Sequence, residues 1–295
     1  MARDDELLDN WWDDAFSGPV SFMRFKFSKD LENADIAVLG VPYDLGTTNR
    51  PGARFGPRAM REQSTLTGEF EYGLWPWDYH IAEHHKVIDY GDICNFVGYP
   101  ERMTDALQKT VDEILASDTA CFSMGGDHFI SLPLLRSHVK KFGPLALIHF
   151  DAHSDTWVDE DYNHGTMFYH AIKEGLIDTK HSIQVGLRTP NPETHGIEII
   201  FADELDEMKA SEVAERIKKR VGNNNAYLTF DIDFLDPAYL MPMHICEYTD
   251  DLINQGKLRL NKAANDEMTL TFHDSCNVAR ATSMGGRPGG QFEIP

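Results

Sequence analysis

Cysteine, long apolar runs and basic targeting segments are all scarce in this 295-residue chain. There are four cysteines, they are widely spaced and none forms a CxxC pair, which argues against a disulfide framework. No apolar run approaches the roughly 18–20 residues that cross a bilayer, and the acidic start MARDDELLDNWWDD is unlike a secretory signal. We therefore expect a cytoplasmic protein without a membrane partner.

Positive charge is also in short supply. The chain has 27 Lys and Arg against 48 Asp and Glu, which gives a formal net charge of −21. Nucleic acids and anionic membranes are held by clustered Lys and Arg, so this balance argues against both as partners. An acidic chain of this kind suits a cationic ligand or bound metal ions instead.

Short β-branched and aromatic runs alternate with helical patterns along most of the chain. The runs that predict buried strands are residues 36–41, 87–90, 121–124, 145–150, 182–187 and 226–232. Apolar residues at i, i+3 and i+4 spacing predict helices around residues 103–115, 132–139 and 213–221. This alternation predicts an α/β fold in three layers, αβα, with a mainly parallel sheet.

Three clusters of polar residues follow predicted strands directly. They are GGDH at 125–128, DAHSD at 151–155 and DID at 231–233. Functional groups in open α/β sheets gather beyond the carboxyl ends of the strands, so the three clusters could converge. In an extended chain, side chains at alternate positions point the same way, which would align Asp151, His153 and Asp155, and likewise Asp231 and Asp233.

Each cluster also has an ordinary structural interpretation. A lone GGDH is typical of a glycine turn followed by a capping Asp, and a lone DxD is typical of a helix cap. All three clusters together, each at a strand end, favour a dinuclear metal site.

The side chains in these clusters are those of a hard-metal centre. The six candidate ligands are His128, Asp151, His153, Asp155, Asp231 and Asp233. Four carboxylates brought together at the end of a buried sheet would be costly without cations, and two divalent ions would neutralise them. Oxygen-rich ligation with two imidazoles favours Mn²⁺, and Zn²⁺ or Co²⁺ fit less well. Such an ion pair lowers the pKa of a bridging water and so supplies a hydrolytic nucleophile.

The motifs GGDHF, HFDAHSD and LTFDIDFLDP resemble those of the ureohydrolase (arginase/agmatinase) family, which hydrolyses guanidino compounds at a dimanganese centre. Residues 17–25 and 38–62 are similar to the same family, and the resemblance extends over about residues 11–238. It implies an arginase-like fold, two Mn²⁺ ions as cofactor and a homo-oligomer.

The resemblance also implies a role for each ligand. One Mn²⁺ would be held by His128, Asp151, Asp155 and Asp231. The other would be held by Asp151, His153, Asp231 and Asp233, so that Asp151 and Asp231 bridge the two ions. The hydroxide between the ions would attack the guanidinium carbon, and Asp155 would pass a proton to the departing amine. His164, in HGTMF, resembles the family's histidine that shuttles protons or steadies the substrate.

The stretch that follows DAHSD favours a small cationic guanidino substrate. Its sequence, DTWVDEDYNHGTMF, is acidic and aromatic, which would repel a substrate carboxylate. Within the family this favours the hydrolysis of agmatine to putrescine and urea. Guanidinobutyrate, which carries a carboxylate, is the alternative substrate.

Residues 239–295 depart from the family pattern. They show neither the Gly/Pro-rich loop, nor the Glu-bearing strand that would hold the guanidinium, nor the closing helix. We therefore predict a catalytic domain at 1–238 whose sheet is incomplete at its C-terminal edge, joined to an atypical segment that is a fusion or a rearranged terminus. This segment contains a predicted strand at 268–272.

Part of the atypical segment resembles cysteine-rich pieces of heterodisulfide-reductase-type iron–sulfur proteins. Those proteins carry paired cysteines, whereas this segment has only Cys246 and Cys276. Two alternatives to an active hydrolase follow from the tail. One is a metal-binding but catalytically weak relative that lacks the substrate-holding Glu, and the other is a redox subunit.

Overall fold

The computed structural model describes residues 18–67, 79, 81–94, 98–189 and 191–235, together with two strands at 268–271 and 291–294. Cys246 and Cys276, on which the redox interpretation depends, lie outside the described residues. The division of the chain near residue 238 falls next to the same gap and stays a prediction.

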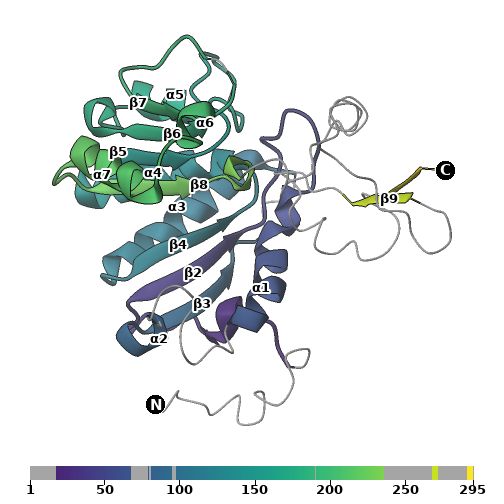
Figure 1. Ribbon diagram of the computed structural model, residues 1–295. Helices are drawn as coiled ribbons and strands as arrows, with labels where there is room; N and C mark the ends of the chain where they lie inside the picture. The colour runs from purple at the N-terminus through teal and green to yellow at the C-terminus, as the bar shows by residue number, and fades with distance from the viewer. Residues whose placement is uncertain are drawn as a thin grey trace.

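The strands form two parallel four-stranded sheets and one antiparallel pair (Figure 1). The first sheet has the order β1 (Lys26–Phe27), β3 (Val87–Asp92), β2 (Ile36–Val41), β4 (Ala120–Gly125). The second has the order β7 (Glu198–Phe201), β6 (Ile183–Leu187), β5 (Ala146–Phe150), β8 (Ala226–Phe230). The pair is β9 (Met268–Thr271) with β10 (Gln291–Ile294).

All of the predicted strands are present, including the one in the tail. The sequence did not indicate β1, which has only two residues, or β7, which lies at a sheet edge with half of its side chains partly exposed. Both strands are too short or too polar to give a clear apolar pattern.

The three predicted helices are confirmed as α3 (Pro100–Ala116), α4 (Ser131–Phe142) and α7 (Ala210–Val221). The remaining helices are α1 (Gly56–Thr67), α2 (Ile81–His84), α5 (Met167–Lys173) and α6 (Ala202–Leu205). No apolar periodicity indicated α1, because polar residues, Arg61 and Ser64, lie on its buried face. Among the described residues, the helices are too short or too polar for one to cross a membrane.

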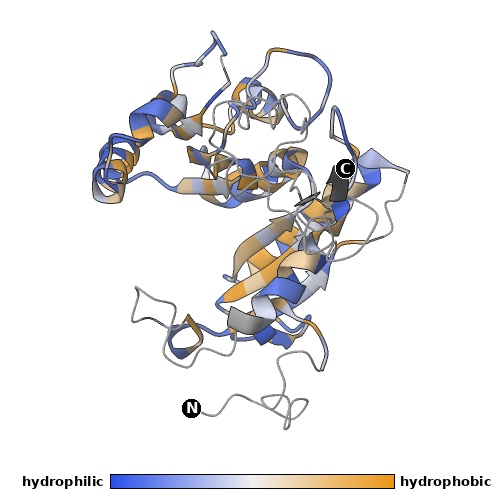
Figure 2. Cartoon of the chain, turned by 45° about the vertical axis from the view of Figure 1, so that its right-hand side comes forward, coloured by the Kyte–Doolittle hydropathy of each residue, from blue (hydrophilic) through white to orange (hydrophobic). Residues whose placement is uncertain are grey.

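The helices cover both faces of the sheets, which confirms the αβα layering. One large core joins both sheets to α3, α4 and α5, and includes Leu39 of β2, Leu107 of α3 and Leu147 of β5, each with no exposed surface. On the opposite face, α1 and α2 pack under the first sheet, and α6 and α7 pack under the second. Figure 2 shows that the strands are largely hydrophobic, whereas the helices carry both hydrophilic and hydrophobic residues.

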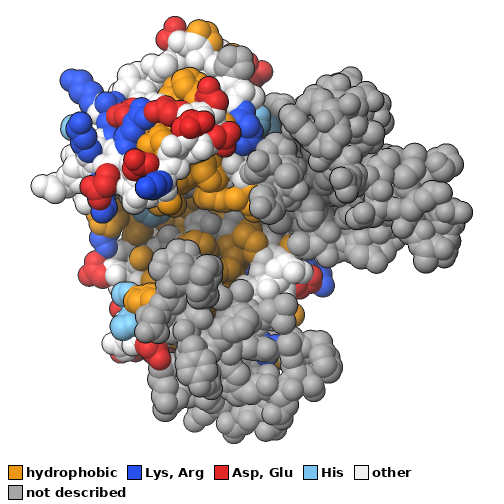
Figure 3. Space-filling model, viewed as in Figure 1, with side chains coloured by type: hydrophobic (Ala, Val, Ile, Leu, Met, Phe, Trp, Pro, Cys, Tyr) orange, Lys and Arg blue, Asp and Glu red, His pale blue; other side chains and the backbone are white. Residues whose placement is uncertain are grey.

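Within the described ranges, β4 and β8 are edge strands of separate sheets. No described residues pair these two strands, each of which ends its own four-stranded sheet. Phe122 of β4 is 50% exposed, and Leu228 and Phe230 of β8 are 62% and 50% exposed. Figure 3 shows hydrophobic side chains in the hollow between the upper and lower parts of the molecule. β8 directly precedes the DID motif, and whether the sheet is incomplete at this edge stays a prediction, because most of residues 236–295 lie outside the described residues.

A buried ion-pair network joins α1 to the carboxyl end of β3. Arg61 donates to both oxygens of Asp89, from Nε at 2.7 Å and from Nη2 at 2.9 Å, and its Nη1 donates to Asp92 at 2.6 Å. Asp89 has no exposed surface and also accepts from the backbone N–H of Phe22 and Gly91. The Asp89 carboxylate thus ties β3 to α1 and to the 3-10 helix at Phe22–Arg24.

We expect Arg61→Met to lower the free energy of unfolding by about 3–5 kcal/mol, because the substitution leaves the buried Asp89 without its cation. The matched control is Arg58→Met on the same helix, whose exposed ion pair with Glu62 should contribute about 0.3–0.5 kcal/mol. Urea denaturation of both variants measures the difference. Equal losses in the two variants would contradict this account of the network.

Candidate metal centre

The three polar clusters converge at the carboxyl ends of β4, β5 and β8. Nδ1 of His128 lies 3.1 Å from Oδ2 of Asp151, 3.0 Å from Oδ2 of Asp155 and 3.5 Å from Oδ2 of Asp231. The side chains of His128, Asp151 and Asp155 are at most 9% exposed. One residue from each of the three strand ends therefore contributes to a single buried group.

A second group lies against the other oxygen of Asp151. Nδ1 of His153 is 3.4 Å from Oδ1 of Asp151 and 3.0 Å from Oδ2 of Asp233. The atoms of Asp151, His153 and Asp233 are close enough together to surround one ion. Since Oδ2 of Asp151 faces His128 and Oδ1 faces His153, one carboxylate belongs to both groups.

The local backbone differs from the extended chain that the alternating pattern suggested. Residues 151–153 form bends, and Asp155 has a φ of +52°, in the left-handed region. Asp231 caps the short 3-10 helix Ile232–Phe234 and accepts a hydrogen bond from the backbone N–H of Asp233. The prediction that these side chains align along a strand is wrong, although their convergence is confirmed. The capping interpretation of DID is confirmed, and the ligand interpretation stays a prediction.

Two glycines allow the strand ends to approach one another. Gly126 has a φ of +61°, and a Cβ there would lie 2.4 Å from the carbonyl oxygen of Val41. Gly186 of β6 has a φ of +96°, and a Cβ there would lie 2.4 Å from the ring of Phe234. Larger residues would push away the segments that carry His128 and Asp233.

The His128 ring has one satisfied nitrogen and one that lacks a hydrogen bond. Its Nε2 lies 2.8 Å from Oγ1 of Thr229, whereas its Nδ1 is buried and has no partner in hydrogen-bond geometry among the described residues. Three carboxylates nevertheless surround Nδ1. An imidazole that is oriented through one nitrogen and aims the other at carboxylates is the arrangement of a metal ligand.

The carboxylates repel one another strongly when no cation is present. Burial, together with the charges of Asp233 and Asp151, raises the pKa of Asp231 well above its usual value. Burial and the charge of Asp151 also raise the pKa of Asp155. Hydrogen bonds that the protonated His153 ring donates to the carboxylates of Asp151 and Asp233 raise the pKa of His153 to about 11. Without metal, protons must therefore compensate the negative charge that divalent cations could neutralise.

His164 is held beside this centre by the loop that follows β2. Its backbone N–H donates to the carbonyl of Gly46 at 2.9 Å, and its Nε2 accepts from the backbone N–H of Thr48 at 3.2 Å. The loop is itself fixed by Asp127, which accepts from Gly46 N at 2.7 Å, and by Asp44, which pairs with Arg54. Burial is the largest cause that lowers the pKa of His164. Sequence reasoning found His164 but did not find the loop contacts that orient it.

Sequence reasoning also missed two buried polar residues, His149 and Gln184. His149 Nε2 lies 2.8 Å from Oδ2 of Asp151, and the Gln184 amide reaches His149 Nδ1 at 3.0 Å. His149 is close enough to His128, Asp151 and Asp155 to be considered a ligand itself. The signal in the sequence was a histidine placed inside an otherwise apolar strand, LALIHF.

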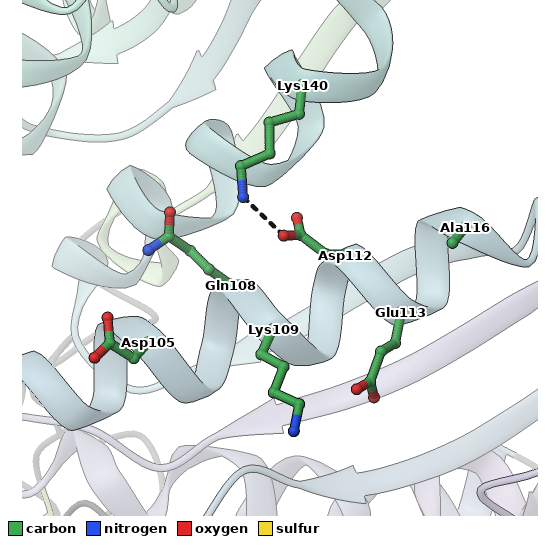
Figure 4. Close-up of a pocket in the computed structure, with 7 residues that line it drawn as sticks. All are labelled: Asp105, Gln108, Lys109, Asp112, Glu113, Ala116 and Lys140. Carbon is green, nitrogen blue, oxygen red and sulfur yellow. Dashed lines mark hydrogen bonds and ion pairs between the residues drawn. The ribbon is translucent and has the colours of Figure 1, made fainter.

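Two surface hollows lie outside the metal centre. One, of about 510 Å³, lies over α3, where Lys140 of α4 donates to Asp112 at 2.7 Å (Figure 4). The other, of about 610 Å³, lies beside the end of β6. There the guanidinium of Arg188 donates to the backbone carbonyls of Asp233, Phe234 and Leu235, and so clamps the turn that carries Asp233.

Comparison with known proteins gives consistent results. The model of the arginase family matches residues 34–242. The agmatinase of Photorhabdus laumondii is 44% identical over 236 residues, which is 79% of this chain and 76% of the relative. The crystal structure of a hypothetical agmatinase from Burkholderia thailandensis superimposes with a TM-score of 0.74 at 46% identity, covering 77% of this chain and 72% of the other.

A more distant structure was solved with Mn²⁺. It is a formiminoglutamase variant from Trypanosoma cruzi with a TM-score of 0.62 and 25% identity, covering 72% of this chain and 74% of the other.

We expect the affinity of the metal-free protein for Mn²⁺ to rise with pH. The raised pKa values of Asp155 and Asp231 favour their neutral forms, and a cation binds their ionised forms, so binding must displace protons. Affinity should change about tenfold per pH unit for each proton displaced. Calorimetry in buffers of different ionisation enthalpy counts these protons. Binding that releases none would contradict the prediction.

Proposed function

Because the chain belongs to the arginase family, we propose that it is a dimanganese amidinohydrolase that hydrolyses the guanidinium group of agmatine to putrescine and urea. The observation that carries the proposal is the position of Asp151. Its two oxygens face two separate ligand groups, as a carboxylate shared by two ions requires. The family and the hydrolysis of amidino substrates are established by the comparisons, and the metal, substrate and residue roles are our inference.

The proposed ligand sets follow the two groups around Asp151. One ion takes His128, Asp151, Asp155 and Asp231. The other takes Asp151, His153, Asp231 and Asp233. The unpartnered Nδ1 of His128 and the mutual repulsion of the carboxylates both support this fit. The oxygen-rich set supports manganese over softer metals.

Two bound Mn²⁺ ions supply a water whose pKa is lowered enough for attack at neutral pH. The protein's own groups handle the protons and the substrate. Asp155 is buried within the first ligand group, 3.0 Å from Nδ1 of His128, where its carboxylate could accept a proton and pass it to the departing amine. Thr48 N–H donates to Nε2 of His164, so the neutral ring carries its proton on Nδ1. With its proton on Nδ1, His164 would steady the substrate or shuttle a proton.

A cationic substrate is supported by the charges near His164. Asp159, Glu160 and Asp161 are exposed on the segment between the metal ligands and His164. Glu160 is paired with Lys173 at 3.0 Å, and with no Lys or Arg between residues 156 and 163 the segment itself carries a net negative charge. Such a surface attracts the free amine of agmatine and repels the carboxylate of guanidinobutyrate. A homo-oligomer in the cytoplasm remains our expectation from the family resemblance.

One observation favours a catalytically weak relative as the second candidate. Asp231 and Asp233 follow β8. Two apolar side chains of this strand, Leu228 and Phe230, are 62% and 50% exposed. Among the described strands β8 is an edge strand, so one ladder holds it where two ladders hold a central strand. If β8 moves, the second ligand group loosens while the family fold persists.

We expect the manganese-loaded protein to release urea from agmatine with a kcat/KM at least about tenfold above that for arginine or 4-guanidinobutyrate. A difference of about 1.4 kcal/mol in the interaction with a carboxylate is sufficient for that ratio. Colorimetric urea measurement with the three substrates tests this. Two bound ions without urea from any substrate would instead support the catalytically weak relative.

We expect Asp151→Ala to remove both ions, because both ligand groups depend on this carboxylate, and Asp233→Ala to leave one ion bound. Metal analysis by mass spectrometry after gel filtration gives the stoichiometry. Asp159→Ala, an exposed acid in the following segment, is the matched control and should keep two ions. Full occupancy of one site in Asp151→Ala would show that the shared role is wrong.

A further inference from the structure

A buried chain of polar groups runs from β6 to the shared carboxylate. Gln184 of β6 lies opposite His149 of β5 in the parallel register, and the two side chains are 1% and 0% exposed. The Gln184 side-chain nitrogen lies 3.0 Å from His149 Nδ1, and His149 Nε2 lies 2.8 Å from Oδ2 of Asp151. Buried polar groups of this kind are stable only when each finds a partner.

The direction of every hydrogen bond in this chain is fixed by one backbone carbonyl. The same Gln184 side-chain nitrogen lies 2.6 Å from the carbonyl oxygen of Ser154, which can only accept. That atom must therefore be the amide nitrogen, and its second hydrogen donates to His149 Nδ1. Nδ1 then has no proton of its own, so the neutral ring carries its proton on Nε2 and donates it to Asp151.

We propose that Gln184 and His149 are positioning residues that orient the bridging carboxylate of the metal centre. With His149 donating to Oδ2, the Asp151 carboxylate cannot rotate freely. Its Oδ2 stays toward His128, and its Oδ1 stays toward His153. Gln184 also anchors the 151–155 turn through Ser154, so one amide fixes both the carboxylate and the backbone that bears the ligands. This inference rests on the proposed dinuclear site.

Packing holds the His149 ring in the required plane. The ring of Phe168, which is fully buried, meets it edge-on at 4.8 Å between centroids. The His128 ring meets it at 5.2 Å, also edge-on. Rotation of His149 out of line with Asp151 would therefore require the surrounding core to move.

The same geometry argues against His149 as a metal ligand, although it lies close to the ligand group. A neutral imidazole coordinates through a nitrogen lone pair. In His149 the Nδ1 lone pair is taken by Gln184, and Nε2 carries the proton that faces Asp151. His149 is thus placed behind the carboxylate, where it supports a ligand and does not replace one.

The experiment compares a substitution of His149 that keeps a side-chain nitrogen at the position of Nε2 with a substitution that removes it. The side-chain nitrogen of His149→Gln can take the place of Nε2 and donate to Asp151, whereas that of His149→Asn takes the place of Nδ1 and cannot reach it. We expect His149→Asn and Gln184→Met to bind Mn²⁺ roughly 10- to 100-fold more weakly than the parent protein. His149→Gln should bind more tightly than His149→Asn.

Ser182→Ala is the matched control for the loss of a buried hydrogen bond. Ser182 precedes the same strand and bonds the backbone of Leu147 and Asp178, away from the metal centre. It should lower the free energy of unfolding while leaving Mn²⁺ affinity unchanged. Equal Mn²⁺ affinity in the parent, His149→Asn and His149→Gln would overturn the proposal.

Nitrogen NMR of ¹⁵N-histidine-labelled, metal-free protein provides a readout that is independent of metal and activity. The His149 resonances, assigned by their absence in His149→Asn, should show the proton on Nε2 in the parent. In Gln184→Met this preference should be reduced. A proton on Nδ1 in the parent would overturn the inference even if two Mn²⁺ ions bind. A proton on Nε2 in a parent protein that binds no Mn²⁺ would uphold the hydrogen-bond chain and overturn both its role at a metal centre and the proposed function.

Discussion

Repulsion among four carboxylates is the constraint around which this end of the molecule is built. Asp151, Asp155, Asp231 and Asp233 are brought together by strand ends that the cores on either side of the sheet hold in place. The cost of bringing them together is visible in the raised pKa values of Asp155 and Asp231. A fold that keeps this arrangement without cations must retain protons in it. Binding of divalent ions at this site would therefore release protons.

Contacts around the site restrict how far the carboxylates can move apart in response to their mutual repulsion. Asp127 fixes the loop that orients His164, and Arg188 clamps the turn that carries Asp233. Asp127 and Arg188 form hydrogen bonds with backbone groups, so they set the position of whole segments as well as single side chains. Such outer contacts determine ligand geometry because a free carboxylate would rotate away from its neighbours.

The sequence revealed the layers of the fold and the six candidate ligands, but not the local geometry that unites them. The strand ends were predictable because apolar runs stop at GGDH, DAHSD and DID. The turns were not, since the left-handed Asp155 and the cap formed by Asp231 depend on contacts across the sheet. His149 was overlooked because a histidine within an apolar strand gives no periodic signal, and its meaning depends on Gln184, 35 residues away. Helix α1 was hidden for a related reason, because it buries Arg61 against Asp89.

The open edge and the metal centre are linked through β8. This strand pairs with β5 over its whole length, so Asp231 follows β8 just as Asp151 follows β5. The other edge of β8 has no ladder among the described residues, and Leu228 and Phe230 remain exposed there. Asp151 is thus held from both sides, by the DID turn beyond β8 and by the β6 side chains. The DID turn is held by the ladder from β8 to β5, by Arg188 and by the ring of Phe234, which packs against those of Phe150 and Phe230. The second ligand group is the more exposed half of the centre, because the side chain of His153 is 47% exposed.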